Sequence, residues 1–246
     1  MFKNLKTEGL EQSEDRLGGG FSKLPTDIYT GVIKQFYGMK SSGGAQGVVL
    51  IIDINGQEYR ESIYATNKKG ENFYQKDGKN YQLPGFITLN DIALCTVGKQ
   101  LNELEWEEKQ VKQYDFEKKA EVVKAAEVAV ELIGQTVTVA IVNTLKNKQE
   151  KNAAGDYVDV AGDREENHIE KVFDTDSLMT VREAIDKKES AEFHPQWLEK
   201  NKGVQRDKRS IKDGQAAGNA GAPPKSGGAS SAPPTSSGAS LFKKKS

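Results

Sequence analysis

Residues 48–64 read VVLIIDINGQEYRESIY, and this stretch decides the fold. A nearly continuous apolar run at residues 48–54 is followed by Asn55-Gly56 and then by a second strand-like segment at residues 57–64. Asn-Gly between two such runs is the strongest short-range signal for a β-hairpin with a two-residue turn. The sequence therefore predicts two antiparallel strands joined at Asn55-Gly56.

The two-residue turn also determines which residues of this hairpin share a face. It places Ile54 opposite Gln57, and because side chains alternate along a strand, every second residue of each strand then shares a face with this pair. That face is the more apolar one and is the better candidate for the core. The alternate face is half polar and presents Arg60 and Tyr64 among aliphatic neighbours.

Further segments extend the β pattern on both sides of the hairpin. Residues 27–40 are rich in Ile, Tyr, Thr, Val and Phe and are predicted as one long strand with Gly31 inside it. A glycine inside a strand weakens it unless it permits strong coiling or a bulge, as small barrels require. Residues 136–145 form another clean β run, and weaker strand patterns lie at residues 105–116, 155–160 and 168–173.

Short helices are predicted where capping residues precede apolar positions. Thr88 with Asp91 resembles a capping box that opens a helix closed by Gly98, and Thr180 with Glu183 caps another. Residues 193–202 form a further short helical piece.

Residues 117–133 show helical spacing of apolar residues, and residues 67–83 are predicted to form a loop with a tight turn at Asp77-Gly78. Strands thus come first, then a helix, then strands, without βαβ alternation. This order predicts a mainly β protein with helices (α+β), built as a small OB-type β-barrel with helical insertions.

Charge is unevenly distributed along the 246 residues. The net charge is −1, but residues 203–246 carry eight basic and two acidic residues, so the rest of the chain sums to −7. An acidic body with a basic tail argues against a protein that coats nucleic acid by bulk charge alone. Any nucleic-acid site on the body must therefore be local.

Cys95 is the only cysteine, so a disulfide framework and a thiolate metal cluster are excluded, and a reducing, cytosolic compartment is expected. No apolar run approaches the ~20 residues that span a bilayer, so no membrane partner is expected. His168 and His194 lie in different segments, and Asp174 and Asp176 fit a helix cap better than a metal site. With no phosphate-binding loop either, we expect no enzymatic activity, no cofactor and no metal.

Basic residues are interleaved with aromatic residues on the predicted β elements, which is how single-stranded nucleic acid is held. Bases stack on aromatic rings for roughly 1–3 kcal/mol each, and Lys and Arg follow the phosphates. Aromatic residues are enriched in any strand, so the pattern alone leaves a protein-binding β domain equally open. The candidate DNA-binding residues are Lys34, Tyr37, Lys40, Arg60, Tyr64, Lys68, Lys69, Phe73, Tyr74 and Lys76.

The C-terminal segment is of a different kind. Residues 214–240 are almost purely Gly, Ala, Pro and Ser, a composition that cannot offset its ordering entropy and predicts a flexible tether. The alternatives for its end are an inert, solubilising tail and a peptide that docks to a partner, and the apolar pair favours docking. The candidate docking residues are Leu241, Phe242, Lys243, Lys244 and Lys245.

This combination of features resembles a known family. The β body, the stretch NHIEKVFD at residues 167–174 before a Thr-capped helix, the Gly/Pro/Ser tether and the terminal SLFKKKS are similar to the single-stranded DNA-binding proteins of lytic podoviruses that carry a virion RNA polymerase. Cellular single-stranded DNA-binding proteins have a similar layout but an acidic tip. A basic tip should instead meet a partner with an acidic groove and an apolar pocket.

The resemblance implies a phage protein that coats single-stranded DNA in replication and recombination, in the cytoplasm of the infected bacterial host. It also implies activation of the host RNA polymerase at late promoters through the basic C-terminus, with phage replication proteins as further partners of the tail. The alternative is a transcription co-activator whose β domain binds protein and not DNA.

On this interpretation the chain has four parts. Residues 1–23 are a flexible N-terminal arm, and residues 24–190 are the OB-type DNA-binding domain. Residues 191–212 are a short helix and a basic linker, and residues 213–246 are the disordered tether with its basic docking tip.

Overall fold

The hairpin at Asn55-Gly56 forms with the predicted register. β2 (Gln46–Ile54) and β3 (Gln57–Tyr64) are antiparallel, with Ile54 opposite Gln57 and Gly47 opposite Tyr64. Asn55 and Gly56 have φ of 53° and 83°, the left-handed conformations that a two-residue turn of this kind needs. The computed structural model describes residues 23–115, 118, 120–153 and 155–211.

The described residues contain many strands and few helices, so the protein is mainly β as predicted. The other strands are β1 (Asp27–Lys40), β4 (Phe73–Lys76), β5 (Lys79–Gln82), β6 (Trp106–Asp115), β7 (Ala120–Ala129), β8 (Thr136–Lys151), β9 (Tyr157–Phe173) and β10 (Arg206–Asp207). The helices are α1 (Pro84–Val97), α2 (Val181–Ile185) and α3 (Phe193–Asn201), with short 3-10 turns at η1 (Leu101–Glu103) and η2 (Val130–Leu132).

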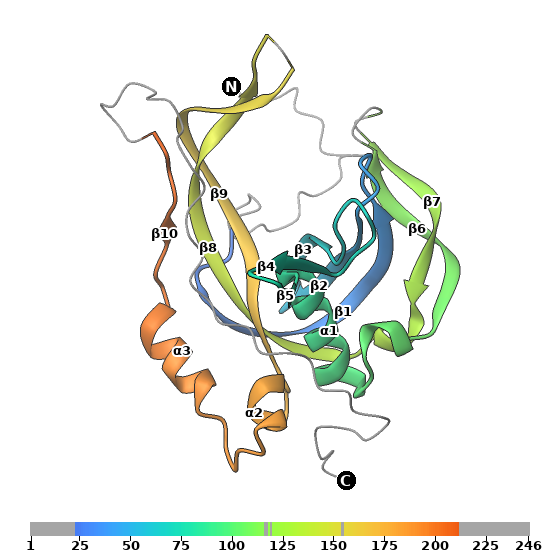
Figure 1. Cartoon of the computed structure of the whole chain (residues 1–246), viewed down its shortest axis with the longest axis vertical. Coiled ribbons are helices and arrows are strands. Elements are labelled where there is room, and N and C mark those ends of the chain that lie inside the picture. Colours follow the sequence, from blue (N-terminus) through green and yellow to red (C-terminus); the bar gives the residue numbers. More distant parts are fainter. Residues whose placement is uncertain (1–22, 116–117, 119, 154, 212–246) are drawn as a thin grey trace, which may run out of the picture.

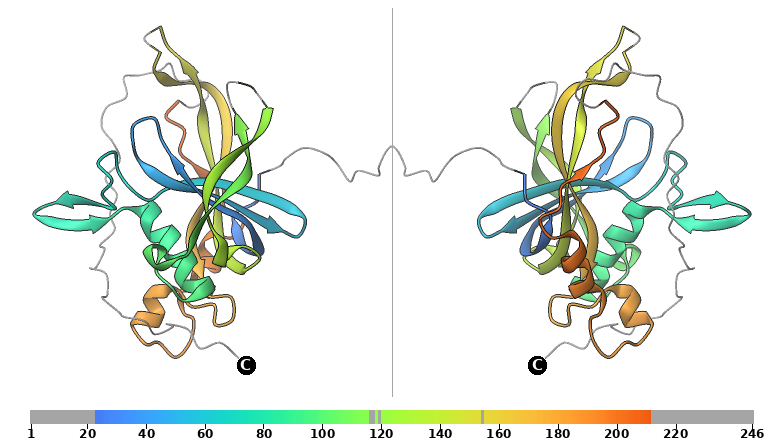
Figure 2. Two further views of the ribbon diagram at one scale, coloured as in Figure 1. Left: turned by 90° about the vertical axis from the view of Figure 1, so that its right-hand side faces the viewer. Right: turned by 90° about the vertical axis from the view of Figure 1, so that its left-hand side faces the viewer.

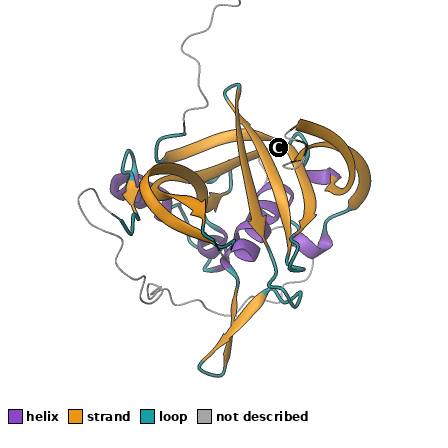
Figure 3. Ribbon diagram, turned by 90° about the horizontal axis from the view of Figure 1, so that it is seen from above, coloured by secondary structure: helices purple, strands orange, loops and turns teal. Residues whose placement is uncertain are grey.

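Eight of the strands in the described residues form one curved sheet. Its main path runs β10-β8-β1-β2-β3, with β9 on the other side of β8 and the β6–β7 hairpin beside β1, whereas β4 and β5 pair only with each other. The long β8–β9 hairpin and the curved β6–β7 hairpin rise from the sheet in Figure 1. From above, the strands curve around the helices at the centre (Figure 3).

β1 connects the two halves of this sheet. Residues 27–32 pair with β8 and residues 32–40 pair with β2, so the strand coils in its middle. A Cβ atom on Gly31 would lie 2.5 Å from both the Asp53 carbonyl oxygen and Ile52 Cγ2. The glycine is therefore needed because β1 and β2 approach each other closely here.

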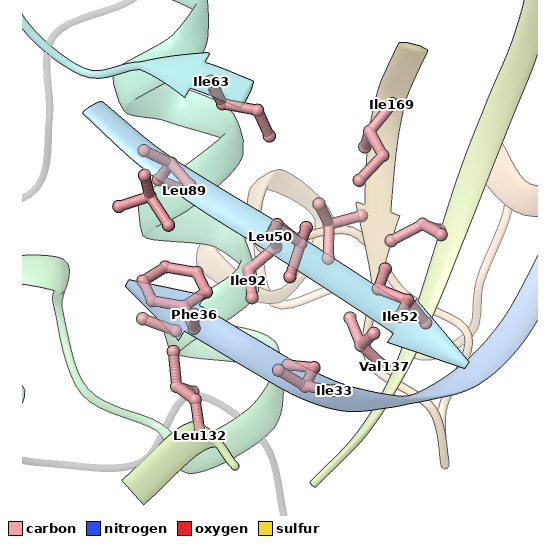
Figure 4. Close-up of a cluster of buried hydrophobic side chains, with 14 of the residues drawn as sticks. Ile33, Phe36, Leu50, Ile52, Ile63, Leu89, Ile92, Leu132, Val137 and Ile169 are labelled. Carbon is pink, nitrogen blue, oxygen red and sulfur yellow. The ribbon is translucent and has the colours of Figure 1, made fainter. Parts of the chain in front are cut away.

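The main core lies where β1, β2, β3, α1, β8 and β9 direct apolar side chains toward one another (Figure 4). The hairpin face predicted to be apolar is the one that faces this core. The fully buried residues of the main core include Ile33, Phe36, Leu50, Ile52, Leu89, Ile92, Val137 and Val139.

The sheet is open between β3 and β9. Within the described residues no backbone ladder joins these two strands, and α1 contacts both. A side-chain bridge crosses the same gap, because the Ile169 N–H donates to Glu61 Oε2 at 3.0 Å and the Tyr59 hydroxyl donates to the same oxygen at 2.7 Å. Burial raises the pKa of Glu61, although these hydrogen bonds oppose the shift.

One predicted helix is wrong. The apolar spacing at residues 117–133 suggested a helix, but residues 120–129 form β7, which pairs with β6 along its whole length and with β1 at Val128. Pairing of β6 with β7 satisfies the backbone N–H and C=O groups of both strands at once. Tertiary pairing therefore outweighs the helical propensity of its alanines and glutamates.

Other elements differ in extent. α1 begins at Pro84 instead of Thr88, whose hydroxyl donates to the Pro84 carbonyl oxygen at 3.1 Å, and it ends at Gly98 as predicted. The segment predicted as a loop, residues 67–83, contains the β4–β5 hairpin, and the two weak strand patterns after residue 155 belong to the single strand β9. The Thr180–Glu183 capping box of α2 is confirmed.

The segment predicted as helix and linker packs against the sheet. Trp197 of α3 is buried with Ala140, Val142 and Phe173, and its Nε1–H donates to Glu170 at 2.8 Å. Arg206 of β10 donates to both oxygens of the same carboxylate. Burial would raise the pKa of Glu170, but the hydrogen bonds from Arg206 and Trp197 hold it below its usual range.

Candidate nucleic-acid interface

The face of β1, β2 and β3 that points away from the main core carries a second apolar cluster and an exposed arginine. Tyr37, Val49 and Ile51 are buried there together with Val111 and Val128 of the β6–β7 hairpin. Arg60 of β3 lies directly opposite Ile51 and donates from Nη2 to the Tyr37 hydroxyl at 3.1 Å. We call Tyr37, Val49, Ile51, Arg60, Ser62 and Tyr64 the outer face.

Tyr37 and Tyr64 have different roles on the outer face. The Tyr37 side chain is only 1% exposed, so its ring cannot stack on a base, and burial raises the pKa of its hydroxyl while Arg60 opposes the shift. Tyr64 is 45% exposed and lies four residues beyond Arg60 on the same face of β3. Tyr37 therefore positions the guanidinium, and Tyr64 offers an open ring.

Four of the predicted DNA-binding lysines lie beside β1, β2 and β3, one of them alone and the other three together. Lys34 is exposed on β1 and pairs with Asp53 at 3.6 Å. Lys40 ends β1, and the segment with Lys68 and Lys69 continues from β3 alongside the start of β2, since the Ala65 and Thr66 N–H groups donate to the Gln46 carbonyl oxygen. The Lys68 side chain lies against Gly43 in the β1–β2 loop, so these three lysines gather near one end of the outer face.

The β4–β5 hairpin carries the remaining predicted residues and projects from the body (Figure 2). Tyr74 stacks on Tyr81 across the hairpin, with ring centroids 5.5 Å apart and an angle of 23° between the rings, and Tyr74 is 42% exposed. Phe73 is half-buried at the base, and Lys76 stands opposite Lys79 beside the turn. Two cations facing each other repel, so an anion between them would be favoured.

Sequence reasoning missed the β8–β9 hairpin. Tyr157 is 65% exposed and the Lys151 ammonium lies 5.3 Å from its ring centroid. Lys146 and Arg164 lie further down the same hairpin, where both pair with Glu166. The prediction ended this strand at residue 145. Residues 146–151 read KNKQEK and are polar throughout, so no alternation of apolar and polar residues marked the extension.

Other candidate groups have structural partners. The His194 ring packs edge-on against the Phe173 ring, with ring centroids 5.1 Å apart. The pKa of His168 is lowered, mainly by burial and also by the positive charge of nearby Lys208. Asp174 accepts hydrogen bonds from the Ser177 N–H and hydroxyl within a turn, and Thr180 is the N-cap of α2, so Asp174 does not cap this helix as predicted. The docking residues 241–245 lie outside the described residues.

Two kinds of feature are absent from the described part of the chain. It contains no group of three or more His, Cys, Asp or Glu side chains placed to hold a metal ion. Within it, no helix has the length and apolar character needed to cross a membrane. The sequence matches no protein-family model and no curated protein.

Proposed function

We propose that the protein binds single-stranded DNA across the outer face of an OB-type β-barrel. The spatial order β3-β2-β1-β8-β9, a first strand shared between both halves and a helix after the third strand support this fold. In OB folds the face of the second and third strands, together with the loops beside it, binds oligonucleotides. On this proposed fold, the outer face, the β1–β2 loop and the β8–β9 hairpin would correspond to these positions.

The observation that carries the proposal is the hydrogen bond from Arg60 to Tyr37. It holds an exposed guanidinium over an apolar surface, on the same strand face as the exposed Tyr64 ring. A phosphate can pair with Arg60 while a neighbouring base stacks on Tyr64, which is the combination that single-strand binding uses. The Tyr74–Tyr81 and Lys151–Tyr157 pairs extend the same chemistry onto two hairpins.

The biological setting follows from the family resemblance. We propose that the protein coats single-stranded DNA in phage replication and recombination, in the cytoplasm of the infected host. We also propose that residues 241–245 contact the host RNA polymerase and activate it at late promoters. The exposed Tyr64 ring and the Arg60 guanidinium on the outer face favour DNA binding over the alternative, a co-activator whose β domain binds protein.

A titration of the full chain with oligothymidine tests the proposal. The intrinsic fluorescence should be quenched, and the affinity should fall as salt rises, with a slope of about −0.7 per phosphate contacted. A duplex of equal length should bind more weakly, because its bases cannot reach the rings. A chain that shows no quenching at low salt but still binds RNA polymerase would be the co-activator, and the DNA-binding proposal would be wrong.

A further inference from the structure

A cavity of about 540 Å³ lies at the Lys40 end of the sheet, apart from the Arg60 end of the outer face. It is open to solvent and is lined by residues from the ends of β1 and β2, the segment after β3, α1 and the start of β6. Met39, Phe86, Leu101 and Trp106 supply its apolar lining, and Trp106 also packs on Phe36 with ring centroids 6.0 Å apart. We call it the Trp106 cavity.

One carboxylate lines this cavity, and a second lies next to it on the neighbouring strand. Glu127 of β7 lines it, and Glu108 of β6 lies directly opposite Glu127 on the strand face that carries Trp106. Like charges directly opposite each other destabilise a strand pair. Neither carboxylate forms an ion pair within the part of the chain that the structure describes. A cation bound here would therefore reduce the repulsion between the Glu108 and Glu127 carboxylates, which the β6–β7 hairpin itself does not reduce.

The charge at the cavity selects its occupant. A nucleotide would bring a phosphate toward Glu108 and Glu127, whereas an apolar side chain followed by cations would place each group beside its complement. Lys40 also lines the cavity, but it lies on β1 and not on the hairpin that carries the two glutamates. The sequence contains such a peptide at Leu241-Phe242-Lys243-Lys244-Lys245.

The chain outside the structure is long enough to bring this peptide to the cavity. Leu241 lies 30 residues beyond Ile211, the last residue described. Fully extended, 30 residues span about 100 Å, against a diameter of about 40 Å for a folded body of this size. A tether of this length also holds the peptide at an effective concentration of about millimolar.

We propose that the C-terminal tip of this chain docks in the Trp106 cavity of its own body. Leu241 and Phe242 enter the apolar lining, and Lys243 to Lys245 pair with Glu108 and Glu127. A partner that binds the tip must then compete with the cavity, so docking holds the tip back until a partner with higher affinity is present. This inference does not depend on DNA binding by the outer face.

Quenching of tryptophan fluorescence by acrylamide in the full chain tests the docking. The chain has two tryptophans, and Trp197 is only 4% exposed, so a change in quenching reports Trp106. The double variant Leu241→Ala/Phe242→Ala should raise the Stern–Volmer constant about twofold, because a millimolar tip with millimolar affinity covers Trp106 about half of the time. Glu127→Lys should have the same effect, since it reverses the charge that receives the lysines.

Glu121→Lys is the matched control. Glu121 is exposed on the same face of β7, six residues away, which is about 20 Å along a strand. It makes the same charge change outside the cavity and should quench like the parent chain.

Four results of the quenching experiment would contradict docking of the tip within one chain. Equal quenching of the parent and the Leu241→Ala/Phe242→Ala variant would overturn the proposal, as would equal effects of Glu127→Lys and Glu121→Lys. Quenching that depends on protein concentration would assign the cavity to the tip of a second copy and would overturn docking within one chain. Protection of Trp106 by oligothymidine in the double variant, without any effect of the tip, would assign the cavity to DNA.

Discussion

Arg60 and Tyr37 show how a buried aromatic residue can serve a surface site. Arg60 crosses β2 to reach the Tyr37 hydroxyl, so a ring that is 1% exposed still determines where an exposed charge lies. From the sequence pattern alone, Tyr37 and Tyr64 are equally good candidates to stack on a base. Only their exposure separates Tyr64, which can stack, from Tyr37, which positions its neighbour.

Replacing Tyr64 and Arg60 tests these roles. Tyr64→Ala should weaken oligothymidine binding by about 1–3 kcal/mol through the loss of one stacked base, whereas Tyr64→Phe should bind almost like the parent. Arg60→Ala should reduce the salt slope by about 0.7, one phosphate contact. Arg182→Ala on α2 removes the same charge elsewhere and serves as the control. If Tyr64→Ala and Arg60→Ala both fold and bind oligothymidine like the parent, the outer face is not part of the DNA site.

A second residue-scale prediction concerns Gly31. Gly31→Ala should destabilise the protein by about 1–3 kcal/mol, because the new methyl group would overlap the Asp53 carbonyl oxygen and Ile52. Gly38→Ala on the same strand is the control, since its nearest neighbour atom would be 3.6 Å away. Urea denaturation gives both values. Equal midpoints for the two variants would show that β1 can relax away from β2.

The third concerns the pH dependence of stability. Burial raises the pKa of Asp91 to about 7, although nearby Lys171 opposes the shift. In the unfolded chain the value is about 4, so between pH 4 and 7 the unfolded chain ionises this group while the folded protein keeps it protonated. Unfolding then releases a proton, and stability should fall as pH rises from about 4 to about 7.

Asp91→Asn removes this ionisation. Its urea midpoint should exceed that of the parent by more at pH 7.5 than at pH 4.5. Asp176→Asn, an exposed carboxylate replaced in the same way, should leave the pH profile of the parent unchanged. An unchanged profile in Asp91→Asn would mean that Asp91 is ionised in the folded protein.

At the scale of elements, the β4–β5 hairpin is the candidate to close over bound DNA. It projects from the body and carries the Tyr74–Tyr81 stack with Lys76 and Lys79 at its turn (Figure 2). In the free protein, trypsin should cut near Lys68-Lys69 or Lys76, and oligothymidine should suppress these cuts. Tyr74→Ala should weaken that protection. Equal cleavage with and without DNA would falsify closure by this hairpin.

At the scale of the whole molecule, the body and the tip should carry separate activities. Deleting residues 241–246 should abolish binding to host RNA polymerase, and Leu241→Ala/Phe242→Ala should do much of the same damage while keeping the charge. Oligothymidine affinity should change little, because the tip lysines pair with Glu108 and Glu127 when the tip is docked and, when it is free, are screened beyond about 8–10 Å from the DNA at physiological salt. A pull-down alongside a titration measures both. A truncated chain that keeps polymerase binding, or loses most of its DNA binding, would contradict this division.

Local sequence determined the parts of this fold whose partners are close in the chain. The Asn55-Gly56 turn, the Thr180–Glu183 cap and the end of α1 at Gly98 were predictable, because each depends on backbone conformations that a few neighbouring residues set. The hairpin register, and hence the shared face of Arg60 and Tyr64, followed from the turn alone.

Tertiary structure decided what depends on distant partners. Residues 120–129 form a strand only because β6 and β1 offer edges to pair with, and Tyr37 is buried only because Val111 and Val128 close over it. The gap between β3 and β9, where α1 contacts both strands, likewise involves segments far apart in the chain. Pairing and burial are set by contacts between segments far apart in the chain, and no local pattern of residues records them.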